Sequence, residues 1–175
     1  MTRLYQLAAQ FRHAIDSSVK EGLLNKDKIF RSFPRGCCGD TCYLLAEFLH
    51  KYDIDTVYVC GRYRNQSHAW LVLKDDRVKT PQKQYAIPME IKDILLQYGE
   101  CVQQDGIVDT SHYTEADVQE GILIDITADQ FDELPVYVGV SDRFHSKFEF
   151  GCAHDMYNLE NDRLRNLYQE ISRFI

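Results

Sequence analysis

The sequence has no long apolar run and little positive charge, and each absence excludes a class of protein. No stretch approaches the ~18 consecutive apolar residues of a membrane-spanning helix, so we expect no membrane partner. Acidic residues outnumber basic ones by 27 to 20, which gives a net charge of −7, and no more than two basic residues occur in a row. A nucleic-acid-binding surface needs a basic patch, so we expect no nucleic-acid partner either.

The N-terminus also lacks the apolar segment of a secretion signal, which predicts a cytoplasmic protein; export by a machinery that uses no cleavable signal stays open. Six cysteines in 175 residues are too few for a disulfide scaffold, so we expect mostly reduced thiols. Eleven Tyr and nine Phe favour a packed fold, and the length predicts one domain over residues 1–175. The sequence does not determine the oligomeric state.

The spacing of apolar residues predicts an α+β fold with an antiparallel sheet. Helices are expected at about 4–19, after Gly39, from 88 or 89 to 98, and at about 155–174, and strands at 56–63, 67–74, 121–126 and 135–140. The core then covers about 33–140, and an insertion over about 75–120 separates the second strand from the third. Insertions of this length commonly shape a substrate cleft or lid.

Two adjacent cysteines, Cys37 and Cys38, lie in a glycine-bracketed turn that runs into an apolar helix. A cysteine at a helix N-terminus feels the positive end of the helix dipole, which favours the thiolate form. A thiolate is the nucleophile of cysteine hydrolases and acyltransferases, and the N–H groups of the same turn can bind an oxyanion. We expect Cys38 to be the nucleophile because it directly precedes Gly39 and the helix; Cys37 is the alternative.

Two polar residues on predicted strands complete a candidate catalytic set. His68 begins the second strand and shares one face with Trp70 by alternation along the strand. Asp125 interrupts the apolar third strand, where a buried carboxylate needs a partner. An imidazole is the natural partner, because the carboxylate then fixes its tautomer and stabilises its protonated form.

The order of Cys38, His68-Ala-Trp70 and Asp125-x-Thr resembles the transglutaminase-like branch of the papain-like cysteine enzymes, over about residues 33–131. The resemblance implies a nucleophile helix packed on an antiparallel sheet and a protein or peptide substrate. We expect no cofactor and no metal, because the sequence has no ligand-rich calcium-binding loop. It also implies that Cys38 is the nucleophile, His68 the general base and acid, and Asp125 the orienting carboxylate. Candidate substrate-binding residues are Trp70, Arg35 upstream of the cysteines, and Gln130 after the third strand. Trp70 can wall the cleft or simply pack in the core, and both alternatives stay open.

Other interpretations of the same residues stay open. Arg35-Gly36 before the cysteines is similar to the motif of arylamine N-acetyltransferases, and a catalytically inactive binding module fits the pattern too. A metal site could use Cys38 with Cys42, or Cys152 with His154, but structural zinc needs two short cysteine spacings and only one is present. We expect Cys42, Cys60 and Cys101 to pack in the core, and His112, His145 and His154 to lie on the surface.

Overall fold

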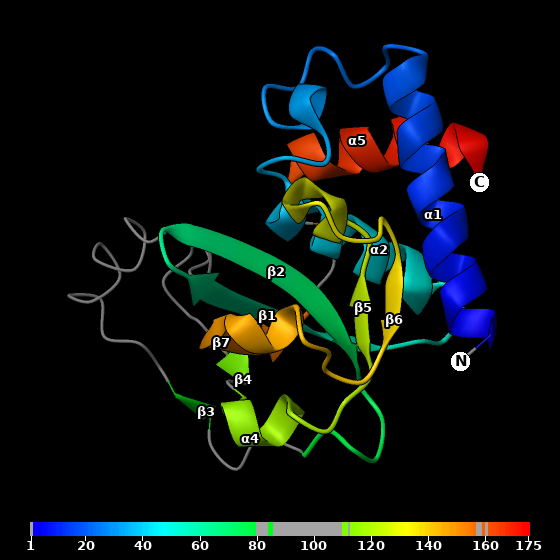
Figure 1. Ribbon diagram of the computed structural model, residues 1–175. Helices are drawn as coiled ribbons and strands as arrows, with labels where there is room; N and C mark the ends of the chain where they lie inside the picture. Colours follow the sequence, from blue (N-terminus) through cyan, green and yellow to red (C-terminus); the bar gives the residue numbers. More distant parts are fainter. Residues whose placement is uncertain (1, 80–83, 86–109, 112, 157–158, 160) are drawn as a thin grey trace.

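A five-stranded antiparallel sheet forms the centre of this α+β protein, in a computed structural model that describes residues 2–79, 84–85, 110–111, 113–156, 159 and 161–175 (Figure 1). The strand order is β6-β5-β2-β1-β7. The bounds of these strands are Thr56–Tyr63 for β1, Gln66–Leu73 for β2, Leu123–Asp125 for β5, Tyr137–Gly139 for β6 and Glu149–Asp155 for β7. A separate two-stranded sheet pairs β3 (Gln84–Tyr85) with β4 (Thr110–Ser111).

The α-helices are α1 (Thr2–Lys20), α2 (Cys38–His50), α4 (Glu115–Val118) and α5 (Asp162–Ile171), and the 3-10 helices are η1 (Phe30–Ser32), η2 (Ala128–Phe131), η3 (His145–Lys147) and η4 (Ser172–Phe174). Figure 1 shows α1, α2 and α5 gathered on one side of the sheet. Within the described ranges, no helix combines the length and the apolarity needed to cross a membrane.

The predicted hairpin of β1 and β2 is confirmed and forms the middle of the sheet. β1 is rich in β-branched and aromatic residues, which fit a pleated and half-buried surface. Its partner β2 pairs with it in continuous register from Thr56 opposite Leu73 to Tyr63 opposite Gln66. The turn between them includes Arg64 in the left-handed region, with φ of 55°. This hairpin carries His68 at a fixed position in the sheet, opposite Gly61.

Two apolar cores cover the two faces of the sheet, because alternate residues of each strand point to opposite sides. The larger core joins the apolar faces of α1, α2 and α5 to strand residues such as Leu71 and Ile124. The smaller core contains Trp70 and Leu123, together with aromatic residues from the segment around η3. By the same alternation, His68 and Asp125 belong to the face that carries the smaller core.

The C-terminal part of the chain differs from the sequence prediction. The predicted helix over about 155–174 is observed from Asp162 on, and Asp155, where it was expected to begin, is the last residue of β7, which pairs with β1 at the edge of the sheet. The β1–β7 pairing contains a register shift at Cys60 and Gly61. The alternation in β7 is weak, which is why the pattern did not predict a strand. The predicted helix from 88 or 89 to 98, Cys101 and His112 lie outside the described residues.

Candidate active site

The structure begins α2 at Cys38, with Cys37 as the residue that precedes the helix. Gly36 has a φ of +71°, a conformation that residues with a side chain rarely adopt, and it turns the chain into the helix. The backbone N–H groups in the first turn of a helix have no partner within the helix. Cys38 therefore lies among free N–H donors, at the positive end of the helix dipole.

The two adjacent cysteines have different surroundings. The Cys37 thiol donates to the carbonyl oxygen of Pro34 at 3.2 Å, and burial raises the pKa of Cys37 to about 12. The Cys38 side chain is 9% exposed and interacts with the imidazole of His68. The structure thus brings Cys38 to His68 and leaves Cys37 as a neutral thiol bound to the backbone.

His68 is fully buried on β2 and lies between Cys38 and Asp125. Its Nε2 donates to Oδ2 of Asp125 at 2.6 Å, and its ring is enclosed by aromatic rings, including Phe131 at 5.0 Å and Phe148 at 5.5 Å between centroids. Burial by itself lowers the pKa of His68. The charge and hydrogen bond of Asp125, with a contribution from Cys38, outweigh burial and raise this pKa to about 9.

Asp125 is buried at the end of β5, and both of its oxygens accept hydrogen bonds. Oδ1 accepts from the backbone N–H of Thr127 at 2.8 Å and from its hydroxyl at 3.2 Å. Oδ2 accepts from His68 at 2.6 Å and from Nε2 of His145 at 3.2 Å. Burial opposes the charged form, but the two imidazoles overcome it and lower the pKa of Asp125. Asp125 is therefore an ionised carboxylate with its acceptor positions filled.

His145 was predicted to lie on the surface, and this prediction is wrong, because η3 buries its side chain to 3% exposure. Its Nε2 faces Asp125, and its Nδ1 lies 2.8 Å from Oδ1 of Asp142. Phe144 and Phe148, spaced four apart around His145, are buried with it. That apolar pair was the available sequence signal. His154 was also predicted to be exposed but is buried, with its ring stacked on Tyr58 at 4.8 Å.

The three candidate substrate-binding residues occupy different positions. Gln130, on η2, has its Nε2 3.1 Å from Nδ1 of His68 and its Oε1 3.4 Å from the backbone N of Gly36. It therefore connects the histidine to the turn before Cys38. Trp70 is buried, with its ring 5.8 Å from His68 and 5.3 Å from His145. Arg35 is exposed in the turn before Cys38.

A buried arginine on α1 fixes the segment that follows Asp125. Arg12 donates to the carbonyl oxygen of Ile126 at 2.8 Å and to that of Pro135 at 3.2 Å. It also forms two hydrogen bonds with Asp129, and its guanidinium lies over the ring of Phe33 at 4.7 Å. One side chain thus fixes both the segment with Gln130 and the segment that leads to the cysteines.

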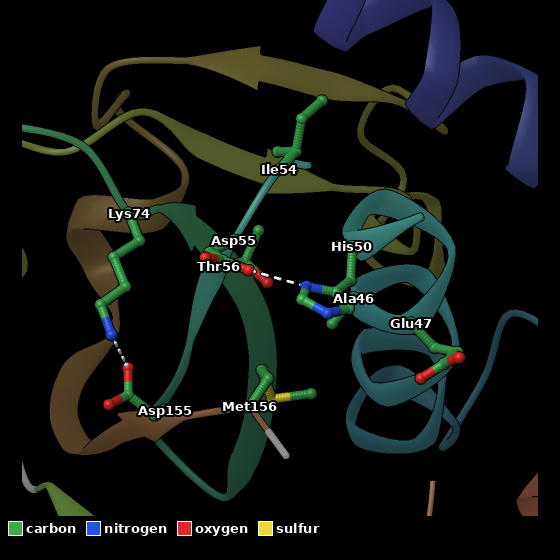
Figure 2. Close-up of a pocket in the computed structure, with 9 residues that line it drawn as sticks. All are labelled: Ala46, Glu47, His50, Ile54, Asp55, Thr56, Lys74, Asp155 and Met156. Carbon is green, nitrogen blue, oxygen red and sulfur yellow. Dashed lines mark hydrogen bonds and ion pairs between the residues drawn. The ribbon is translucent and has the colours of Figure 1, made fainter. Parts of the chain in front are cut away.

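A cavity of about 260 Å³ lies at the other end of α2 from Cys38 (Figure 2). Two pairs of polar side chains line it, His50 with Asp55 at 2.8 Å and Lys74 with Asp155 at 2.6 Å, together with Glu47. None of the residues that line it contributes to the contacts around His68. The cavity is therefore separate from the candidate active site.

Within the described part of the chain, one group of three residues has the composition of a metal site: His68, Asp125 and His145, whose ligand atoms lie within 4.8 Å of one another. Zinc binds such ligands at about 2.0–2.2 Å, so two of them on a tetrahedral ion lie roughly 3.4 Å apart. The 2.6 Å between His68 and Asp125 is shorter and is that of a direct hydrogen bond. This geometry fits three side chains joined directly by hydrogen bonds to Asp125.

No protein-family model, curated protein or solved structure matches this chain. A function is therefore inferred from its own residues. Cys38, His68, Asp125 and His145 form a continuous line of contacts from the first turn of α2, through β2 and β5, to η3. Such a line can transfer a proton from the thiol to the imidazole and stabilise the charged pair that results.

Proposed function

We propose that this protein is a cysteine-nucleophile enzyme of the papain-like, transglutaminase-like class, which acts on the amide carbonyl of a peptide bond or a glutamine side chain. The observation that carries the proposal is the line of contacts Cys38–His68–Asp125, with Cys38 at the first position of a helix. A nucleophile beside a base, and a base oriented by a buried carboxylate, is the arrangement that activates a thiol.

In this proposal, His68 already holds the proton of the thiol, as its raised pKa requires, and the Cys38 thiolate attacks the carbonyl carbon. The negative charge on the substrate oxygen is met by the free N–H groups in the first turn of α2. The C–N bond then breaks as His68 gives its proton to the leaving nitrogen, which leaves a thioester on Cys38. The acceptor then attacks the thioester carbon while His68 takes its proton, the C–S bond breaks, and the Cys38 thiolate is released beside the protonated imidazole. Water as acceptor gives hydrolysis or deamidation, and an amine gives transglutamination.

The residues around Cys38 indicate how a substrate approaches the sulfur. His68 is fully buried and Trp70 nearly so, whereas Arg35, Gly36 and Gln130 are at least partly exposed. A substrate would therefore reach Cys38 from the side formed by the turn before α2 and Gln130. Trp70 would not contact the substrate and would instead support the site by packing against His68.

The test is alkylation by iodoacetamide as a function of pH, with the labelled cysteine identified by mass spectrometry. We expect Cys38 to be labelled rapidly below pH ~7, where a thiol with the ordinary pKa of ~8.5 reacts slowly. His68→Gln should slow this labelling by about tenfold or more, and Cys37→Ala should leave it unchanged. Slow labelling of Cys38 that does not depend on His68 would overturn the proposal and leave an inactive binding module.

A positive result is followed by a substrate assay that separates the acceptors. Glutamine-containing peptides are incubated with and without a primary amine, and ammonia release, peptide cleavage and amine incorporation are measured in parallel. Cys38→Ala is the reference for each product. Ammonia without incorporation identifies a deamidase, incorporation identifies a transglutaminase, and cleavage identifies a protease. Loss of every product in Cys38→Ala is required in each case.

A further inference from the structure

Both ring nitrogens of His145 face the oxygen of an ionised carboxylate. Nε2 lies 3.2 Å from Oδ2 of Asp125, and Nδ1 lies 2.8 Å from Oδ1 of Asp142. Burial opposes ionisation of Asp142, but hydrogen bonds from the backbone and ring of His145 and from the N–H of Phe144 lower its pKa. A neutral imidazole has one N–H, so only the doubly protonated ring donates to both carboxylates. The two contacts together fit a ring that carries a proton on each nitrogen.

The groups that face this ring come from several elements and are compatible with a positive charge. Asp125 faces it from β5 and Asp142 from the segment before η3. His68 faces it from β2, with 6.3 Å between ring centroids, and Tyr137 from β6, at 5.1 Å. The Tyr137 hydroxyl donates to the carbonyl oxygen of Val140, so it provides no charge. Two carboxylates thus balance a positive charge on His145. The neighbour that competes with it for the Asp125 carboxylate is His68.

His145 and His68 use the same atom. Both rings donate to Oδ2 of Asp125, while Oδ1 is occupied by Thr127. The negative charge of Asp125 is therefore divided between the His68 and His145 rings. In addition, two positively charged rings at this distance repel each other. We propose that His145 is a positioning residue that acts through Asp125: its positive charge limits how tightly His68 holds a proton. The catalytic meaning of this inference rests on the proposed function.

The consequence concerns the proton that His68 transfers. A histidine beside a buried carboxylate, with no competing charge, holds its proton strongly and donates it poorly to a leaving group. His145 reduces that stabilisation while its own hydrogen bonds keep Asp125 ionised and oriented. The site therefore keeps the orienting carboxylate without making His68 too weak an acid for the second half of the reaction.

The test observes His68 directly, by NMR titration of the imidazole nitrogens in the Cys38→Ala background, so that the result does not depend on an active nucleophile. We expect both ring nitrogens of His145 to carry protons at neutral pH. His145→Gln keeps an N–H donor towards Asp125 but removes the charge, and it should raise the titration midpoint of His68 by about one pH unit or more. Asp142→Asn should shift the midpoint in the same direction.

The matched control is His154→Gln, which removes a second buried histidine that stacks on Tyr58. It should leave the midpoint of His68 unchanged even if it lowers stability. A folded His145→Gln variant with an unchanged midpoint would overturn the inference, as would a His145 ring with one unprotonated nitrogen. If Cys38 proves unreactive while the midpoint shifts, the proposed function fails and the coupling between the two histidines stands.

Discussion

Arg12 and Asp129 are 117 positions apart in the chain, yet two hydrogen bonds of 2.9 and 2.7 Å join them. The same guanidinium binds the carbonyl oxygens of Ile126 and Pro135. This contact attaches the first helix to the segment directly after Asp125. The position of Gln130, between His68 and Gly36, depends on that attachment.

Replacement of Arg12 by methionine should destabilise the protein strongly. Methionine keeps much of the apolar stem but leaves Asp129 and the two carbonyl oxygens without their donor. Removal of one partner from a buried ion pair costs about 3–5 kcal/mol, and Asp129 is partly exposed, so we expect the lower end. Urea unfolding measures the change. Arg3→Met, an exposed position on the same helix, should change the free energy of unfolding by less than about 0.5 kcal/mol.

Asp125→Asn should reduce both stability and Cys38 reactivity. The amide can replace some acceptor positions, but it removes the negative charge between two imidazoles and turns one oxygen into a donor. We expect a loss of about 3 kcal/mol by urea unfolding and alkylation of Cys38 at neutral pH slowed at least about tenfold. Asp75→Asn, a half-buried carboxylate in a turn outside the sheet that pairs with nearby Arg77, is the control. Unchanged alkylation in folded Asp125→Asn would show that the carboxylate does not orient His68.

The stability of the protein should depend on pH through His68. Its pKa is raised from an ordinary 6.5 to about 9 in the folded state, so its contribution is complete below pH ~6.5 and is lost as pH rises through 9. The free energy of unfolding of the wild type should therefore fall relative to that of His68→Gln over this window, by at most about 3 kcal/mol. Parallel curves for the two proteins would contradict a raised pKa.

The Asp125 carboxylate affects the pH dependence of stability in the opposite direction to His68. Its folded pKa is lowered, so its contribution is present above about pH 4 and is lost as pH falls towards the folded value. The difference in unfolding free energy between wild type and Asp125→Asn should therefore shrink in acid. Urea unfolding at a series of pH values between about 2 and 7 measures this difference, and a gap that stays constant down to pH 2 would argue against an ionised Asp125.

Trp70 provides an intrinsic optical probe of the site, since it is the single tryptophan of the chain. Its ring lies 5.8 Å from that of His68, and a protonated imidazole quenches tryptophan emission more than a neutral one. Emission should therefore rise as His68 loses its proton near pH 9. His68→Gln should abolish this step, while His154→Gln should leave it in place. A step of equal size in His68→Gln would assign it to another group.

The parts of the fold that follow local patterns were predictable from the sequence. Alternating β-branched and aromatic residues predicted the β1–β2 hairpin, and the helix expected after Gly39 begins two residues earlier, at Cys38. The burial of Asp125 inside an apolar strand followed from its neighbours, and its pairing with an imidazole from the cost of burying a charge. The contact between His68 and Asp125 agrees with that expectation.

The parts that depend on distant partners were not predictable. Glu149–Asp155 becomes a strand because it pairs with β1 at the edge of the sheet, and its own alternation is too weak to indicate this. His145 lies in a polar segment, and its burial is decided by Asp125, 20 positions away, together with the aromatic rings around it. Periodicity describes which face of an element is apolar, but it does not describe a polar side chain that is buried by a specific partner.

The line of contacts from Cys38 to His145 also sets the order in which the site is completed during synthesis. The ribosome makes Cys38 and His68 first, while the carboxylate of Asp125 and the second imidazole follow 57 and 77 residues after His68. The β2–β5 and β5–β6 pairings that bury Asp125 cannot form before then. A nascent chain therefore carries the Cys38 thiol before the contact between His68 and Asp125 can form. Under the proposed function, nucleophilic reactivity would arise only when the last third of the protein has folded onto the first.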